Sequence, residues 1–136
     1  MRFFFFAAAV VILIAGCATP PPSITPGGVT ADVTCEPPKY QDKKFPRIAI
    51  AGETVYVQEA LGLATYRVKL NRDEGKIGYV WFVNPSTMSH LSIDANGGGM
   101  LASVDPNAAN TMTPAQLMLY AYTRDFISLE CKGLAK

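Results

Sequence analysis

The sequence has 136 residues and contains few of the residues on which catalytic and metal sites depend: one histidine, three cysteines and 17% charged residues. A zinc site usually needs three or four nitrogen or sulfur ligands, so we expect neither a metal nor a cofactor. The net charge of +1 lacks the basic excess that proteins use to hold phosphate backbones, which argues against a nucleic-acid partner. The composition also excludes a multidomain enzyme, a collagen-like repeat and a wholly disordered chain.

The apolar residues are concentrated at the amino terminus. Residues 1–16 contain a single charged residue, Arg2, which is followed by an uninterrupted apolar run from Phe3 to Ala15. A membrane-spanning helix needs about 20 residues, so this run is too short to span and fits the apolar region of an export signal. Because Arg2 belongs to the signal, the remaining chain has no net charge.

The end of this run has a more specific pattern. Residues 13–17 are Leu-Ile-Ala-Gly-Cys, which resembles the lipobox of bacterial lipoproteins. The resemblance covers residues 1–17 and implies cleavage before Cys17 and acyl chains on that cysteine, which would hold the protein at a membrane. The next residue is Ala18 rather than the aspartate of inner-membrane lipoproteins, which implies the outer membrane, with the protein facing the periplasm or the cell surface. The alternative is an ordinary secretory signal with a chance cysteine.

Three segments follow from this interpretation: a signal peptide at 1–16, a lipidated cysteine and Pro/Gly-rich tether at 17–34, and one small β-rich domain at 35–136. Residues 18–31 of this tether contain four prolines and no charge, so they favour extended conformations and serve as a spacer. Cys35 and Cys131 remain as a pair in an oxidising compartment, and we predict a disulfide between them. A reactive or metal-binding thiol pair is the alternative, but no Cys-x-x-Cys motif supports it.

Apolar residues of the predicted domain recur mainly with the period of a strand. Residues 65–70 alternate, residues 77–83 are apolar on both faces, and the charged segment 71–76 between them predicts a hairpin turn. Further strands are expected around 48–57, 91–93 and 100–104, with a turn at the glycines of 96–99. We therefore predict an α+β fold with an antiparallel sheet of about five to seven strands, either a sandwich or a partly open barrel.

The carboxyl-terminal segment predicts one helix packed on that sheet. Thr113, Pro114 and Gln116 form the pattern of a capping box with proline at the first helical position. Apolar residues then recur at helical spacing, so we expect a helix over 114–128. Gly133 follows it, at a position where a helix stop would lie. The competing interpretation ends the chain in a strand, because residues 126–131 also alternate in part.

The sequence contains few groups that are arranged for catalysis. His90 lies near Ser86, Ser89, Ser92 and Asp94, but no Gly-x-Ser-x-Gly elbow surrounds any serine and no P-loop lysine follows the glycines. Two carboxylate pairs, Glu53 with Glu59 and Asp73 with Glu74, have no supporting context for glycosidic chemistry. We therefore expect a protein that is not an enzyme.

Two segments are the strongest candidates for binding. The first, 39–47, is basic and aromatic, and the second, 84–90, follows the most apolar predicted strand; together they contribute the candidate binding residues Lys39, Tyr40, Lys43, Lys44, Arg47, Ser86 and His90. We expect the domain to bind an envelope protein or a cell-wall component, or to serve as an accessory subunit of an assembly or secretion system. An inhibitor of a cell-wall hydrolase such as lysozyme is the first alternative, and an envelope hydrolase that uses His90 is the second.

Overall fold

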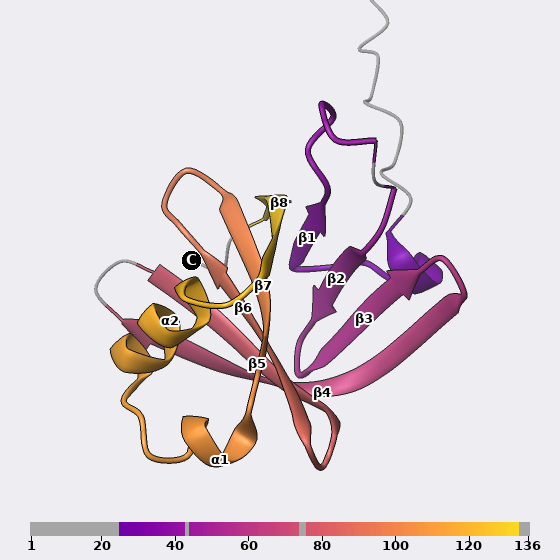
Figure 1. The fold of residues 1–136 in the computed structure, drawn as a ribbon. Coiled ribbons are helices and arrows are strands. Elements are labelled where there is room, and N and C mark those ends of the chain that lie inside the picture. Colours follow the sequence, from indigo (N-terminus) through magenta and orange to yellow (C-terminus); the bar gives the residue numbers. More distant parts are fainter. Residues whose placement is uncertain (1–24, 43, 74–75, 134–136) are drawn as a thin grey trace, which may run out of the picture.

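The computed structural model describes residues 25–42, 44–73 and 76–133. The predicted signal peptide and Cys17 lie outside the described residues. In chain order the elements are η1 (Pro26–Gly28), β1 (Val33–Glu36), β2 (Arg47–Ala51), β3 (Thr54–Glu59), β4 (Gly62–Asp73), β5 (Lys76–Asn84), β6 (Thr87–Ile93), β7 (Gly98–Val104), α1 (Pro106–Ala109), α2 (Pro114–Tyr122) and β8 (Phe126–Lys132), as Figure 1 shows.

The strands form a closed, eight-stranded antiparallel barrel. Each strand pairs with the next one along the chain, and β8 pairs with β1 to complete the circle. The prediction of an antiparallel β-rich sheet is confirmed, whereas five to seven strands, a sandwich and a partly open barrel are wrong. The difference arises because β1 has only four residues and β8 begins within the predicted helix, and these two strands close the barrel.

Because neighbouring strands are antiparallel, their connections alternate between the two ends of the barrel. We call the end with the β2–β3, β4–β5 and β6–β7 connections the turn end. The other end, with the β1–β2, β3–β4, β5–β6 and β7–β8 connections, is the loop end. The two binding segments predicted from the sequence both include connections of the loop end.

The interior of the barrel is filled by one side-chain set of each strand, as the period of two predicts. The largest fully buried side chain is Trp81, and it packs in one cluster with apolar residues from β1 to β6 and from β8. In that cluster lie Val33, Cys35, Ile48, Ile50, Val55, Val57, Val68, Tyr79, Trp81, Leu91, Ile93, Leu129 and Cys131. The barrel is therefore a packed core.

The predicted disulfide between Cys35 and Cys131 is present and crosses the seam at which the barrel closes. The two cysteines are direct partners in the β1–β8 pairing and are 96 residues apart in sequence. A bridge over a loop of this length stabilises the folded state by roughly 4 kcal/mol in the chain-entropy model. The cross-link therefore joins the first and last strands of the barrel directly.

Glycines of the β6–β7 turn make room for this seam. A Cβ atom on Gly99 would lie 2.6 Å from the Cys131 sulfur, and one on Gly97 would lie 2.6 Å from the Cys131 carbonyl oxygen. Gly97 also has a φ of 86°, a backbone conformation that residues with a Cβ rarely adopt. The turn predicted at these glycines is confirmed. Glycine is required there both by the backbone conformation of the turn and by the close packing against β8.

The predicted helix is present over its first nine residues only. The capping box is formed, since Thr113 and Gln116 exchange side-chain and backbone hydrogen bonds, and α2 begins at Pro114. The helix ends at Tyr122, and residues 126–132 form β8, so the expectation of a helix to residue 128 is wrong. The strand is favoured because it pairs with β7 and β1 and buries Leu129 and Cys131 inside the barrel.

The helices α1 and α2 add a second layer to one side of the barrel, where one helix was predicted (Figure 1). Leu117 and Ala121 of α2 pack on the outward-facing side chains of β5, β6 and β7, which are Val80, Met88, Met100, Ala102 and Val104. Among the described residues, no helix is long and apolar enough to cross a membrane.

Candidate functional site

A pocket of about 630 Å³ opens at the turn end of the barrel. Its walls come from the residue before β1, the β2–β3 turn, the second half of β4 and the start of β5. The lining residues are Asp32, Ile50, Gly52, Glu53, Val68, Lys69, Leu70, Asn71 and Tyr79. Its volume lies in the range of sites that bind small molecules or single side chains.

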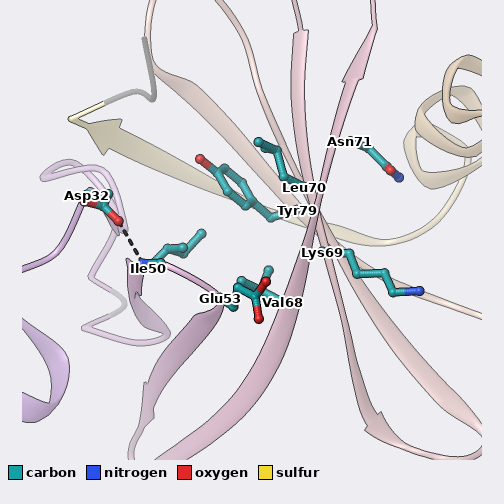
Figure 2. A pocket seen from close by; sticks show the side chains of 9 residues that line it. Asp32, Ile50, Glu53, Val68, Lys69, Leu70, Asn71 and Tyr79 are labelled. Atoms are coloured by element: carbon teal, nitrogen blue, oxygen red, sulfur yellow. Dashed lines mark hydrogen bonds between the residues drawn. The ribbon is translucent and has the colours of Figure 1, made fainter.

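The floor of the pocket is apolar. Figure 2 shows Ile50, Val68, Leu70 and the ring of Tyr79 gathered on one side of β4, while Lys69 and Asn71 point to the other side. This division follows from the alternation of side chains along a strand. Leu70 is 46% exposed, so it offers apolar surface at the mouth rather than in the core.

Asp32 and Glu53 supply the polar rim, and Asp32 is held by the strand edge next to it. Its backbone N–H donates to the Ile50 carbonyl at 2.7 Å, and its carboxylate accepts a hydrogen bond from the Gly52 N–H at 2.8 Å. Glu53 pairs with Arg67 at 2.9 Å, and both side chains are exposed. A short exposed pair of this kind contributes little stability, so Glu53 is able to exchange this partner for a ligand.

Tyr79 is the buried polar group of the pocket. Its side chain is 4% exposed, and its hydroxyl points toward the side on which Asp32 lies (Figure 2). Burial raises the pKa of Tyr79, the charge of Arg72 opposes that shift, and the Asp32 carboxylate adds to it. The phenol is therefore protonated at neutral pH and available as a hydrogen-bond donor.

The basic segment predicted for binding lies away from this pocket, in the β1–β2 connection of the loop end. Lys39, Tyr40 and Lys44 are exposed there, whereas Lys43 lies outside the described residues. Arg47 begins β2 and forms an ion pair with Glu36 of β1 at 2.5 Å. Arg47 is therefore engaged in holding the first two strands together.

Ser86 lies in the β5–β6 connection and borders a second hollow, of about 430 Å³. The hollow is lined by Ser86, Thr87, Ser103, Val104, Asp105, Arg124 and Asp125. None of residues 39–47 lines it. The structure therefore does not bring the two predicted binding segments together in this hollow.

His90 lies in β6 on the outward face of the barrel, beneath α2. It is fully buried, and neither ring nitrogen has a hydrogen-bond partner among the described residues. Gly78 of β5 leaves room for this ring. A Cβ on Gly78 would lie 3.2 Å from the His90 Nε2 and 3.0 Å from the terminal methyl of Met118. In this position His90 is inaccessible to a macromolecular partner, and burial lowers its pKa to about 4.

Of the groups considered for catalysis, His90 is buried beneath α2 and Asp94 belongs to the β6–β7 turn. No hydrogen bond joins His90 to a serine or carboxylate among the described residues. Asp94 accepts hydrogen bonds from the Asn96 and Gly98 N–H groups and so shapes the β6–β7 turn. Over the described ranges, no three His, Cys, Asp or Glu side chains are grouped for a metal ion. The side chains of the Asp73–Glu74 pair lie outside the described residues.

The pocket is not predicted by the sequence. Asp32 falls in the predicted tether, although β1 begins at Val33, two residues before the predicted start of the domain. Tyr79 and Val68 were expected in strands. The β3–β4 pairing sets Val68 beside the β2–β3 turn, where its N–H donates to the Glu53 carbonyl, and the curvature of the sheet brings Tyr79 to the same pocket. The one local signal was Gly52, a turn glycine next to the acidic Glu53.

No protein family, curated protein or solved structure matches the chain.

His90 generates a prediction about pH. Its pKa is about 4 when folded and 6.5 in an ordinary environment, so the unfolded chain binds more protons between these values. The free energy of unfolding should therefore fall as the pH is lowered through this window, by about 3 kcal/mol from this group. Urea unfolding at several pH values measures it.

The His90→Leu variant is the comparator, because carboxylates also titrate in this range. We expect its stability to depend less on pH than that of the parent protein. Equal pH dependence in the two proteins would contradict the assignment of a buried, neutral imidazole.

Proposed function

We propose that the protein is a lipid-anchored lipoprotein of the outer membrane whose barrel is a non-catalytic binding module. Its partner is an envelope protein or a cell-wall component, and the pocket at the turn end is the binding site. The observation that carries the proposal is this pocket, which combines an apolar floor with a polar rim at the end of a filled barrel. Few polar groups around an apolar surface are typical of sites that orient a ligand.

The chemistry of the pocket favours a particular kind of group. Ile50, Val68 and Leu70 offer apolar contacts, while Asp32 and Glu53 accept hydrogen bonds and attract positive charge. The protonated phenol of Tyr79 is a donor and acceptor at the base of the rim. The best fit is therefore a segment that places an apolar stem on the floor and an amino, guanidinium or hydroxyl group at the rim.

The same features favour binding over catalysis. A general base or nucleophile needs a neighbour that activates it, and a phenol with a raised pKa is a poor base at neutral pH. Glu53 is partnered by Arg67, and Asp32 is bonded to the backbone of the β2–β3 turn. The bond from the Gly52 N–H holds the Asp32 carboxylate in place, which lowers the entropic cost of binding.

The anchor rests on the lipobox-like sequence at residues 13–17. We expect wild-type cells fed an alkyne-tagged fatty acid to label the protein and to contain it in the outer-membrane fraction. Cys17→Ser should abolish the label and remove the protein from that fraction, because the acylated sulfur is lost. The matched control is Cys35→Ser/Cys131→Ser, which should keep the label. Equal labelling of the Cys17→Ser variant, or no labelling of the parent, would reject the anchor.

The binding site is tested by photocrosslinking in intact cells. A photoreactive amino acid at Leu70, at the mouth of the pocket, should form a covalent adduct with one defined envelope protein or wall fragment. The same amino acid at Leu119, which is exposed on α2 away from the pocket, is the control and should form none. The mass of the adduct also identifies a cell-wall hydrolase if the protein is an inhibitor.

A second pair of variants tests the rim. Asp32→Asn keeps an oxygen that accepts the Gly52 hydrogen bond but removes the charge, so it should reduce the yield of the Leu70 adduct several-fold. Glu59→Gln, an equivalent change at the loop end, should leave the yield unchanged. Absence of any adduct at Leu70, or an equal effect of the two variants, would overturn the assignment of this pocket.

A further inference from the structure

The first described residues reach the barrel through η1, which contacts β2 and β3. A Cβ on Gly27 of η1 would lie 3.0 Å from the Tyr56 ring and 3.4 Å from the Leu63 side chain. Leu63 is the second residue of β4, next to the β3–β4 connection, and Figure 1 shows η1 beside that hairpin. The chain then runs to Asp32, which bonds to Ile50 and Gly52 at the turn end.

The length of the chain before this point limits how far the membrane lies from the loop end. Cys17 precedes Thr25, the first described residue, by eight residues. Fully extended, eight residues span less than about 30 Å. An acylated Cys17 therefore keeps the bilayer surface within about 30 Å of Thr25. Thr25 adjoins η1, which lies beside the β3–β4 hairpin. The chain from Cys17 therefore joins the domain beside a connection of the loop end.

Large apolar side chains are exposed at this same end. Leu61, at the tip of the β3–β4 turn, is fully exposed, Leu63 is 44% exposed, and Tyr40 in the β1–β2 connection is 81% exposed. Their connections are neighbours, because Arg47 at the start of β2 pairs with Gln58 near the end of β3. A single exposed leucine is common, but an exposed leucine at a turn tip and an exposed tyrosine in the neighbouring connection are suited to a bilayer interface.

The charges around these tips permit contact with lipid headgroups. Lys39 and Lys44 are exposed in the β1–β2 connection, together with the acidic Asp42. Glu59 adds a second acid next to the β3–β4 turn. Because these four exposed charges balance, apolar and aromatic contact carries the interaction.

We propose that the loop end of the barrel rests on the membrane surface, with Leu61 and Tyr40 at the level of the lipid headgroups. This orientation rests on the lipid anchor proposed above. The pocket at the turn end then points away from the bilayer, toward the space in which a partner is reached. The tether, the exposed tips and the pocket thus have distinct positions along the barrel axis.

The test uses the full acylated chain in vesicles of phosphatidylethanolamine and phosphatidylglycerol. A fluorophore sensitive to polarity is attached to Leu61→Cys, and in a second protein to Tyr40→Cys. Both labels should emit at shorter wavelength on reconstitution and be quenched several-fold by lipids with a spin label near the headgroup. The matched control is Ala95→Cys, exposed in the β6–β7 turn at the opposite end, which should be neither shifted nor quenched.

Flotation of the vesicles separates the two proposals. If the protein floats with the vesicles but the labels at 61 and 40 are not quenched, the orientation is overturned and the anchor stands. Stronger quenching at Ala95→Cys would reverse the orientation. If the protein does not float, the anchor fails, and the orientation that depends on it fails with it. Each labelled protein must retain the Cys35–Cys131 bridge, which is checked by its mass without reduction.

Discussion

The pairing of β1 with β8 is the constraint on which the rest of the structure depends. Seven of the eight strand pairings join neighbours in the sequence, and this one alone joins the two ends of the domain. Without it the sheet would have two open edges, which are sites for misassociation. The Cys35–Cys131 bridge lies within this pairing, and Gly99 leaves room for its sulfur.

The proposed binding site depends on the curvature of the sheet, because its lining comes from the stretch of chain between the residue before β1 and the start of β5. Asp32 immediately precedes β1 and is fixed to β2, so its position relative to Tyr79 on β5 depends on the curvature of the closed sheet. The filled interior leaves binding to the ends of the barrel. If the tether holds the loop end near the bilayer, the pocket at the turn end is directed away from the lipid. In that orientation the anchor holds the barrel at the membrane, and the barrel presents the pocket to a partner.

The sequence predicts what depends on local pattern. Alternation over residues 65–70 and 77–83, the glycine turn and the capping box at Thr113 all lead to elements that the structure contains. The barrel closure was missed because β8 alternates only in part and follows a helix, so its pairing partners decide its conformation. The pocket was missed because Asp32 and Tyr79 are far apart in sequence, and no local pattern records that a closed sheet brings them together.

The most direct test of this account compares amide hydrogen exchange in the oxidised protein with exchange in a Cys35→Ala/Cys131→Ala variant. If the bridge holds the seam, β1, β8 and the amide of Asp32 should lose protection first in the variant, while β5 and β6 stay protected longest. Unchanged protection of β1 and β8, or an earlier loss in β5 and β6, would contradict the claim that the barrel depends on its seam.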